Sequence, residues 1–431
     1  MYSEHIDGCI VEAGPDSFLS EKPAASVLAK ELGIADQLIG SNDAQRKTYI
    51  LVKDSLVEMP DGLMFMVPTK IFPTALSPLF SWRTKIRMGM ELLHPPRPMH
   101  TDETVAELVE RHFGPEVVDR LADPLLSGVY GGDASQLSAR AVLQRFVEME
   151  EKYGSLSRAM LAARKKMKQM SKNAAPRPLF TSMKDGMQQM VDAILARLTP
   201  SSLRLNTSVR GIALRDGIWH LALDSGTEKF DAVILCTPAK VAGKLLENVR
   251  PEFAKDLQDI PYSSSVTMTI GYNMSDLKKL PPGFGFLVPR SAGRRMLACT
   301  FVHCKFPHRA PADRGLIRCF LGGANDEAVL GLSDEDITRM VRKDLKEILG
   351  LEAVPRFTRI YKWRGAMAQY TRGHLDRVTR IERYAEELPG FAIAGNAFRG
   401  IGVPDCIRTG ADAAVKIGKY ARESLASASN Q

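Results

Sequence analysis

The chain has 431 residues, of which 45% are apolar and 25% are charged, and its formal net charge is +8. This length and composition indicate a folded protein of roughly two or three domains with a sizeable core, and they exclude a disordered or low-complexity chain. No stretch approaches the roughly 18 uninterrupted apolar residues of a membrane-spanning helix. The positive charge favours an anionic substrate or an acidic membrane surface, and we expect no nucleic-acid partner although charge alone does not exclude one.

The first residues and the cysteines together predict a cytoplasmic location. The first ten residues contain no basic segment followed by an apolar one, so we expect no signal peptide. The six cysteines are scattered without a CxxC pair, which favours free thiols in a reducing cytoplasm. No two histidines have zinc-finger or HExxH spacing, and the sequence predicts no metal site.

The N-terminal third begins with short elements and continues as helices. Residues 8–14 predict a strand, residues 24–34 a helix, and residues 47–60 a hairpin that turns at Lys53–Asp54. The pattern from about 75 to 170 is mostly helical. Within it, residues 156–172 form an amphipathic helix with a basic face, and its apolar stripe either packs on the protein, the favoured interpretation, or rests on a membrane surface.

The chain then changes to strands. Residues 203–209, 218–226 and 231–239 read as strands, with turns at Asp216–Gly217 and Ser225–Gly226. A mixed region from 240 to 375 includes a helix over 334–350. Residues 394–414 form a glycine-punctuated turn and a helix that starts near Val403–Asp405, an arrangement that aims a helix N-terminus at an electron-rich group.

Five motifs occur in one order along the chain. They are VEAGPDSFLSEKP (11–23), LLSGVYGGDASQLSARA (125–141), GFGFLVP (283–289), WRGAMAQY (363–370) and AGNAFRGIGVPDCIRTG (394–410). Together they resemble the FAD-dependent protoporphyrinogen and coproporphyrinogen III oxidase family of haem biosynthesis. The resemblance covers nearly the whole chain, and five motifs in register are far more specific than any one of them.

The resemblance implies an α/β fold with three parts. An FAD-binding Rossmann-like domain would comprise 1–40, 180–238 and 385–431; a mixed-sheet substrate domain would comprise 41–74 and 239–384; and a helical domain over 75–179 would contact membrane in some relatives. Family members open with a GxGxxG loop that binds the ADP half of FAD, and no such glycine trio follows a strand near this N-terminus. We therefore expect an N-terminal βαβ unit to be missing, through a mis-assigned start or a fragment, with a short paralogue as the alternative.

The resemblance also implies which residues bind the cofactor. Those matched to FAD contacts are Gly14, Pro15, Asp16, Ser17, Val209, Trp363, Ala366, Ile401, Gly402 and Val403. Taken alone, Asp16 and Ser17 would read as turn or capping residues, and Val209 as an ordinary strand valine. Ala368 stands where the family usually has proline, which weakens the assignments of Trp363 and Ala366.

Gly128 matches a glycine on the substrate side of the flavin, with a plain helix-terminating glycine as the alternative. Arg46 and Lys47 lie near the strand where some relatives bind a propionate, but Thr48 occupies that position, so no anchor is assigned.

The implied reaction is the six-electron oxidation of a porphyrinogen to a porphyrin by FAD, with oxygen as acceptor and hydrogen peroxide as product. It needs no catalytic side chain, because the cofactor carries the chemistry. As the substrate, coproporphyrinogen III is slightly favoured over protoporphyrinogen IX. The sequence is compatible with an oligomer and with peripheral contact between the protein and the inner face of the membrane. Two alternatives remain: another amine-oxidase-like flavin oxidase or desaturase, and a truncated, non-catalytic porphyrin-binding paralogue.

Overall fold

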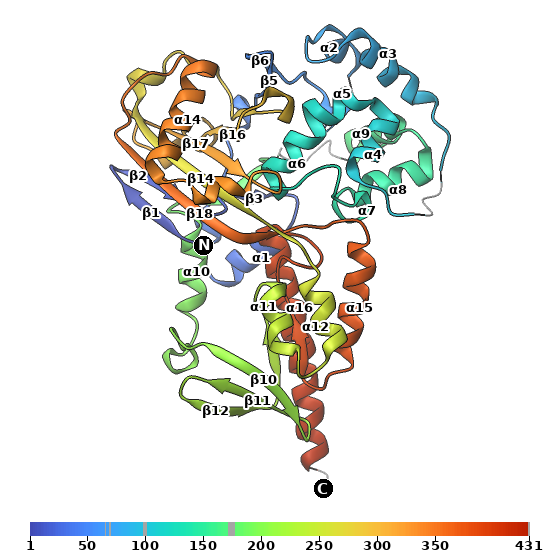
Figure 1. Ribbon diagram of the computed structural model, residues 1–431, viewed down its shortest axis with the longest axis vertical. Coiled ribbons are helices and arrows are strands. Elements are labelled where there is room, and N and C mark those ends of the chain that lie inside the picture. Colours follow the sequence, from blue (N-terminus) through green and yellow to red (C-terminus); the bar gives the residue numbers. More distant parts are fainter. Residues whose placement is uncertain (65, 69, 98–100, 171–176, 430–431) are drawn as a thin grey trace.

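The computed structural model describes residues 1–429 except 65, 69, 98–100 and 171–176. Three regions are visible in Figure 1: a large sheet with its covering helix, a group of helices beside it, and a lower region built around the C-terminal helix. No helix among the described residues combines the length and the hydropathy needed to cross a membrane.

A mixed sheet of seven strands forms the first region, in the order β18-β14-β17-β16-β15-β5-β6. Its strands are β5 (Thr48–Val52), β6 (Ser55–Glu58), β14 (Tyr262–Asn273), β15 (Gly285–Leu287), β16 (Met296–Phe301), β17 (Arg314–Gly322) and β18 (Phe357–Ala368). Only the β15–β5 pairing is parallel. Helix α14 (Asp334–Leu349) buries Ile337, Val341 and Leu345 against the apolar face of the sheet. The predicted hairpin is confirmed: Lys53 and Asp54 turn between β5 and β6 with φ of 48° and 60°.

Helices make up the second region, as the sequence predicts for residues 75–170. They are α2 (Ile71–Leu76), α3 (Trp82–Met90), α4 (Val105–Phe113), α5 (Pro115–Val117), α6 (Asp123–Tyr130), α7 (Ala139–Val142), α8 (Gln144–Tyr153) and α9 (Leu156–Met170). Leu156 and Met160 of α9 are buried in the core of this region. The start of the amphipathic stripe therefore packs on the protein, as favoured. Residues 171 and 172, the end of the predicted helix, lie outside the described residues.

The lower region surrounds α16 (Val403–Ser429). It contains a parallel pair, β13 (Val233–Leu235) with β19 (Phe391–Ile393), and a three-stranded sheet of β10 (Val209–Arg215), β11 (Ile218–Leu223) and β12 (Gly226–Phe230). Helices α11 (Ala239–Leu246), α12 (Pro251–Gln258) and α15 (His374–Glu386) complete it. The strand predicted for 203–209 is wrong: Asn206 has a φ of 55°, which interrupts an extended chain, and β10 begins only at Val209.

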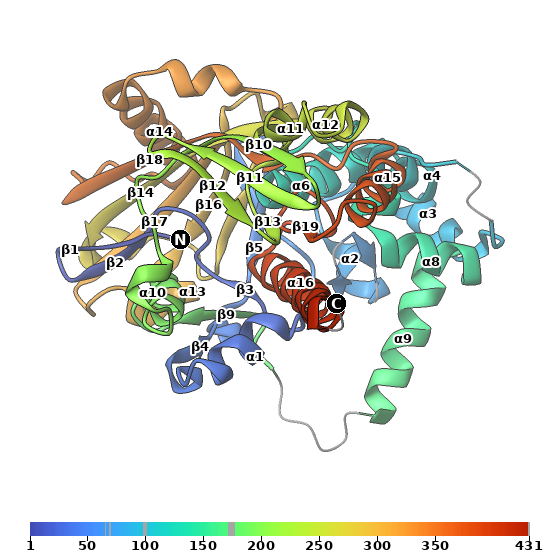
Figure 2. The ribbon, with the colours of Figure 1, turned by 90° about the horizontal axis from the view of Figure 1, so that it is seen from below.

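N-terminal segments connect these regions. Strand β1 (Ser3–Ile6) pairs with β2 (Cys9–Glu12), and β9 (Phe180–Met183) lies between β3 (Phe18–Leu19) and β4 (Leu38–Gly40). Helix α1 (Ala24–Glu31) packs against α16, as the view from below shows (Figure 2). Helix α10 (Gln188–Leu195) follows β9, and α13 (Val302–Lys305) follows β16. All six cysteines are free thiols, as predicted.

Candidate functional site

The loop Gly14–Ser17 links β2 to β3, and its backbone is held by side chains of the large sheet, of which Thr267 and Arg318 are buried. The carbonyl of Ala13 accepts hydrogen bonds from Trp363 Nε1 at 2.9 Å and from Thr267 Oγ1 at 3.2 Å. The carbonyl of Gly14 accepts one from the Arg318 guanidinium at 2.6 Å. Trp363 also lies against Gly14, where an added Cβ would be 3.7 Å from the indole ring. The predicted residues Gly14 and Trp363 are therefore neighbours.

Asp16 belongs to a buried ion cluster and does not cap a helix. Helix α1 has Pro23 at its N-cap with no side-chain cap, so the capping interpretation of Asp16 and Ser17 does not describe their positions. The Asp16 carboxylate lies 3.3 Å from Lys305 Nζ and accepts a hydrogen bond from Ser17 Oγ at 2.7 Å. Burial opposes ionisation, but Lys305 and Arg318 outweigh it and hold the pKa of Asp16 well below its usual range. Asp16 stays ionised and does not act as a proton donor.

A second ion pair supports the same loop. Glu12 and Arg309 are both buried and lie 2.8 Å apart. Arg309 also donates to Ser182 Oγ at 2.6 Å, and that hydroxyl donates to the Asp16 carbonyl at 2.6 Å. The cluster adjoins a cavity of about 10 Å³, room for no more than one water. These charges anchor the loop and do not form a substrate pocket.

Sequence reasoning missed the cations of this cluster. Lys305 and Arg309 lie in loop-like sequence and carry no recognisable pattern. Arg318 is different, because it interrupts the apolar run GLIRCFLGG of β17. A single charge in an otherwise buried strand is a signal for a buried partner, and it could have marked this residue.

The C-terminal turn, residues 394–402, is tied to the same strand that holds the Gly14 loop. Asn396 donates to the carbonyl of Ala366 in β18 at 3.2 Å. The Tyr370 hydroxyl donates to the Asn396 carbonyl at 2.8 Å and accepts from the Gly400 amide at 2.9 Å. Both predicted loops are therefore hydrogen-bonded to β18, at positions three residues apart.

Helix α16 begins at Val403, within the predicted start. Asp405 accepts a hydrogen bond from the Gly402 amide at 3.2 Å and forms an ion pair with Lys22 at 2.6 Å. Among the described residues, no group accepts a hydrogen bond from the Val403 amide, which is one of the unpaired donors of the helix N-terminus. Val403 packs against the cluster that contains Phe18, the residue after the Gly14–Ser17 loop. The unpaired amide of Val403 and the Gly14–Ser17 loop therefore both adjoin this cluster.

Helix α6 contacts the segment that follows β18 from the side of the helical region. Gly128 lies inside α6, and the helix ends at Gly131 in a left-handed conformation, so Gly128 is not the helix-terminating glycine. The carbonyl of Tyr130 accepts a hydrogen bond from the Gln369 side chain at 2.8 Å. The Tyr130 ring makes an edge contact with the Tyr370 ring, with the two ring centroids 6.2 Å apart. Burial, with the charge of Asp405, raises the pKa of Tyr130 to about 12. Both tyrosines therefore remain neutral near pH 7.

Gly128 faces Leu287 of β15, where an added Cβ would lie 3.6 Å from that side chain, and no hydrogen bond or ion pair among the described residues joins it to the Gly14 loop. Among the same residues, Val209 is likewise not joined to that loop. It is the first residue of β10, in the three-stranded sheet of the lower region (Figure 1). A groove of about 660 Å³ between α14 and β18 contains none of the predicted residues either.

Comparison with known proteins gives one family. The model of the flavin-containing amine oxidoreductases matches residues 1–418. The coproporphyrinogen III oxidase of Bacillus subtilis is 34% identical over 406 residues, which cover 94% of this chain and 86% of the relative. The enzyme of the same name from Staphylococcus aureus is 29% identical, with 97% and 90% covered. The chloroplastic protoporphyrinogen oxidase of Nicotiana tabacum is 29% identical, with 93% and 75% covered.

Solved structures agree in fold. A crystal structure of an Exiguobacterium protein, provisionally assigned as a protoporphyrinogen oxidase, superposes with a TM-score of 0.85 at 30% identity and covers 98% of this chain and 90% of that one. A putrescine oxidase variant gives 0.68 at 15% identity, covering 96% and 90%, which shows a shared fold alone.

Proposed function

We propose that this chain, which belongs to the flavin-containing amine oxidoreductase family, oxidises a porphyrinogen to a porphyrin with bound FAD and oxygen. The observation that carries the proposal is the 34% identity to a coproporphyrinogen III oxidase over 94% of the chain. The geometry supports it, because β18 joins the Gly14 loop to the start of α16, and these are the two segments matched to the flavin ring.

The backbone groups at Gly395 and Val403 suit the flavin half of FAD. Gly395 has a φ of 132° and open space where a Cβ would lie, so a ligand can approach its backbone. The Val403 amide is available for an electron-rich ring edge. The residues proposed to hold the flavin are Gly14, Pro15, Asp16, Ser17, Trp363, Ala366, Ile401, Gly402 and Val403. The backbone of Val209 is proposed for the adenine.

When bound, FAD would accept a hydride from the porphyrinogen and pass the electrons to oxygen. The chain orients the ring and stabilises the negative charge that reduction places on it, through the start of α16. Asp16, Tyr130 and Tyr370 keep fixed protonation states, which agrees with a site that has no side-chain acid or base. Gly128 is proposed to lie on the substrate side.

The test is turnover by the purified protein supplied with FAD. We expect a yellow flavoprotein that converts coproporphyrinogen III to its porphyrin and releases three hydrogen peroxide molecules per porphyrin. Coproporphyrinogen is the expected substrate because a positively charged protein suits a tetracarboxylate, so protoporphyrinogen IX should give a lower kcat/KM. Bound FAD without turnover of either compound would instead favour another flavin oxidase or desaturase. Porphyrin binding without FAD binding would favour a non-catalytic paralogue.

Peripheral membrane contact is a second proposal. It rests on α2 and α3 of the helical region and not on the basic amphipathic helix predicted for 156–172. Helices α2 and α3 lie at the outer edge of the helical region (Figure 1) and expose large apolar side chains, namely Phe72, Leu76, Trp82, Ile86 and Met90. Leu93, in the turn that follows α3, is exposed as well. Trp82, Ile86 and Met90 follow one face of α3, beside the cations Arg83 and Lys85.

Sedimentation with anionic phospholipid vesicles tests this contact. The double variant Trp82→Ser/Ile86→Ser should lose most of its binding. The control Leu205→Ser/Val354→Ser removes equally exposed apolar groups elsewhere and should bind like the wild type. Equal binding by all three proteins would contradict the proposal.

A further inference from the structure

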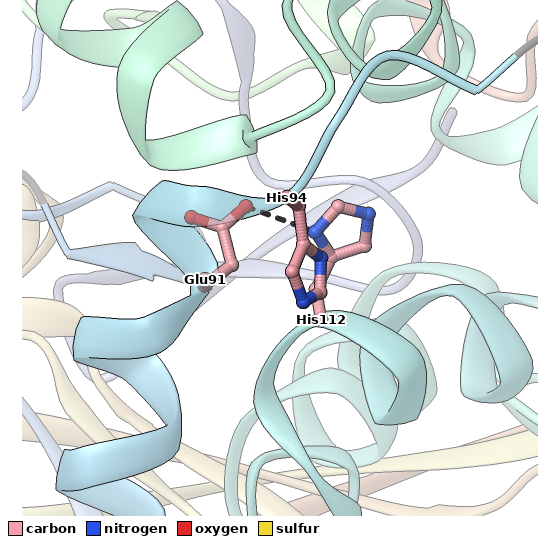
Figure 3. Close-up of side chains that lie close together, drawn as sticks. All are labelled: Glu91, His94 and His112. Carbon is pink, nitrogen blue, oxygen red and sulfur yellow. Dashed lines mark hydrogen bonds and ion pairs between the residues drawn. The ribbon is translucent and has the colours of Figure 1, made fainter.

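A group of potential metal ligands lies in the helical region, between the end of α3 and α4. One carboxylate oxygen of Glu91, one ring nitrogen of His94 and one ring nitrogen of His112 all lie within 4.8 Å of one another (Figure 3). Glu91 and His112 are fully buried, and His94 is half-buried. Among the described residues, it is the one group of three or more such side chains with this spacing.

His112 is oriented as a metal-binding histidine would be. Its Nε2 lies 3.2 Å from Glu150 Oε1, and its Nδ1 faces Glu91 Oε1 at 2.9 Å. Arg111 forms an ion pair with the same Glu150 carboxylate, so that carboxylate is fixed. A carboxylate behind an imidazole holds the ring and directs the other nitrogen to a metal. In His112 the nitrogen so directed is Nδ1, which points to Glu91 and His94.

The charges around the group leave room for a cation. Three carboxylates, Glu91, Glu103 and Glu150, face two cations, Arg111 and a protonated His112. One negative charge is therefore in excess even when His112 carries its second proton. A divalent ion in place of that proton makes the set neutral, which lowers the cost of burying it.

Glu91 also has a structural task that a metal would not disturb. Its Oε2 accepts from Ser155 Oγ at 2.8 Å and from the Ser157 amide at 3.2 Å, and its Oε1 accepts from the Leu156 amide at 2.6 Å. These bonds fix the carboxylate at the start of α9 and leave its Oε1 directed at His112. A tetrahedral zinc ion at ordinary bond lengths separates its ligand atoms by about 3.3 Å, so the 2.9 Å gap between Nδ1 and Oε1 needs to open by only a few tenths of an ångström.

His94 completes the group. Its imidazole makes no hydrogen bond to any described residue, and its ring centroid is 5.1 Å from that of His112. The backbone at His94 is fixed, because its carbonyl accepts from Arg158 at 2.5 Å and an added Cβ at Gly154 would touch it. A half-buried imidazole that makes no hydrogen bond within the described part of the chain is thus held beside a buried carboxylate and a buried imidazole.

We propose that Glu91, His94 and His112 bind a divalent cation of the zinc type, with water at the fourth position. Two imidazoles and a carboxylate suit Zn²⁺ among the common divalent ions. The ion replaces the proton between His112 and Glu91. It links the segment after α3, which carries Glu91 and His94, to the last turn of α4, which carries His112. Through the hydrogen bonds of Glu91 it is also connected to the start of α9. This site is separate from the residues proposed to hold the flavin, and it does not depend on the proposed reaction.

The test is Zn²⁺ binding by the full chain with its flavin, after removal of metal with a chelator. Competition with a chromophoric zinc chelator gives the affinity, and the zinc K-edge X-ray absorption spectrum gives the ligands. We expect one tightly bound equivalent whose spectrum contains two imidazoles. His94→Gln should weaken binding at least about 100-fold by removing a ligand, and Glu150→Gln by about 10- to 100-fold by removing the carboxylate behind His112.

His94→Gln is the main variant, because the His94 side chain makes no hydrogen bond to any residue that the structure describes and its replacement leaves the buried pair intact. His5→Gln removes an exposed histidine elsewhere and should bind zinc like the wild type. Absence of a tight equivalent in the wild type, equal affinity of the wild type and His94→Gln, or a spectrum without imidazole would each overturn the proposal. The buried Glu91–His112–Glu150 group would then be a hydrogen-bonded network alone.

Discussion

Replacement of Arg318 by methionine tests the anchoring of the Gly14 loop. Arg318 is 3% exposed, donates to the Gly14 carbonyl at 2.6 Å and to the Ala13 carbonyl at 3.4 Å, and supports the ionised form of Asp16. Breaking a buried charge interaction by removing one partner costs about 3–5 kcal/mol. Methionine retains much of the volume, so we expect the loss to fall in this range and FAD affinity to fall with it.

Urea unfolding measures the stability, and quenching of flavin fluorescence measures FAD affinity. The matched control is Arg314→Met in the same strand, which removes ion pairs at the protein surface with Asp7 and Asp313. Such pairs contribute about 0–1 kcal/mol, and this variant should bind FAD normally. If Arg318→Met were no more destabilising than Arg314→Met and bound FAD equally well, the anchoring role of Arg318 would be refuted.

Two further predictions concern the same site. The pKa of Asp16 is lowered in the folded protein, so its ionised form adds stability above the unfolded pKa of about 3.9 and loses it as pH falls. The stability difference between wild type and Asp16→Asn in urea should therefore be largest near pH 7 and shrink below about pH 4; a constant difference would contradict this. Tyr370→Phe leaves the Gly400 amide and the Asn396 carbonyl without their partner, and should cost about 1–3 kcal/mol and weaken FAD binding. Tyr49→Phe, which loses a bond to the Pro282 carbonyl, should be destabilised without weaker FAD binding; the same loss of FAD affinity in both variants would argue against a specific role for Tyr370.

Local signals in the sequence predicted local structure well. The turn at Lys53–Asp54 and the start of α16 at Val403 both follow from residues whose preferences act within a few positions. The same reasoning failed for residues 203–208, because an alternating pattern does not reveal that Asn206 takes a left-handed conformation. The identity of the helix-ending glycine was also open from sequence, and the structure assigns it to Gly131.

Long-range partners could not be predicted from the residues alone. Asp16 and Lys305 are 289 positions apart, and Glu91 and His112 face each other across two helices. Nothing in their local sequence specifies these pairings. The first depends on how α13 packs near the end of β2, and the second on how the helical region packs. The resemblance to a family supplied the residues that are proposed to bind the flavin, but it did not supply the cations that hold the Gly14 loop.

The central claim is that the start of α16 stabilises the negative charge on reduced FAD through the unpaired Val403 amide. Val403→Pro removes that amide at a helix position where proline is tolerated, and Val403→Ala removes the side chain but keeps the amide. A hydrogen bond to a charged group contributes about 1.5–3 kcal/mol, which is about 30–60 mV for a two-electron couple. Measured by redox titration of the bound flavin, the potential of Val403→Pro should lie lower than that of Val403→Ala by this amount. Equal potentials in the two variants would contradict the account.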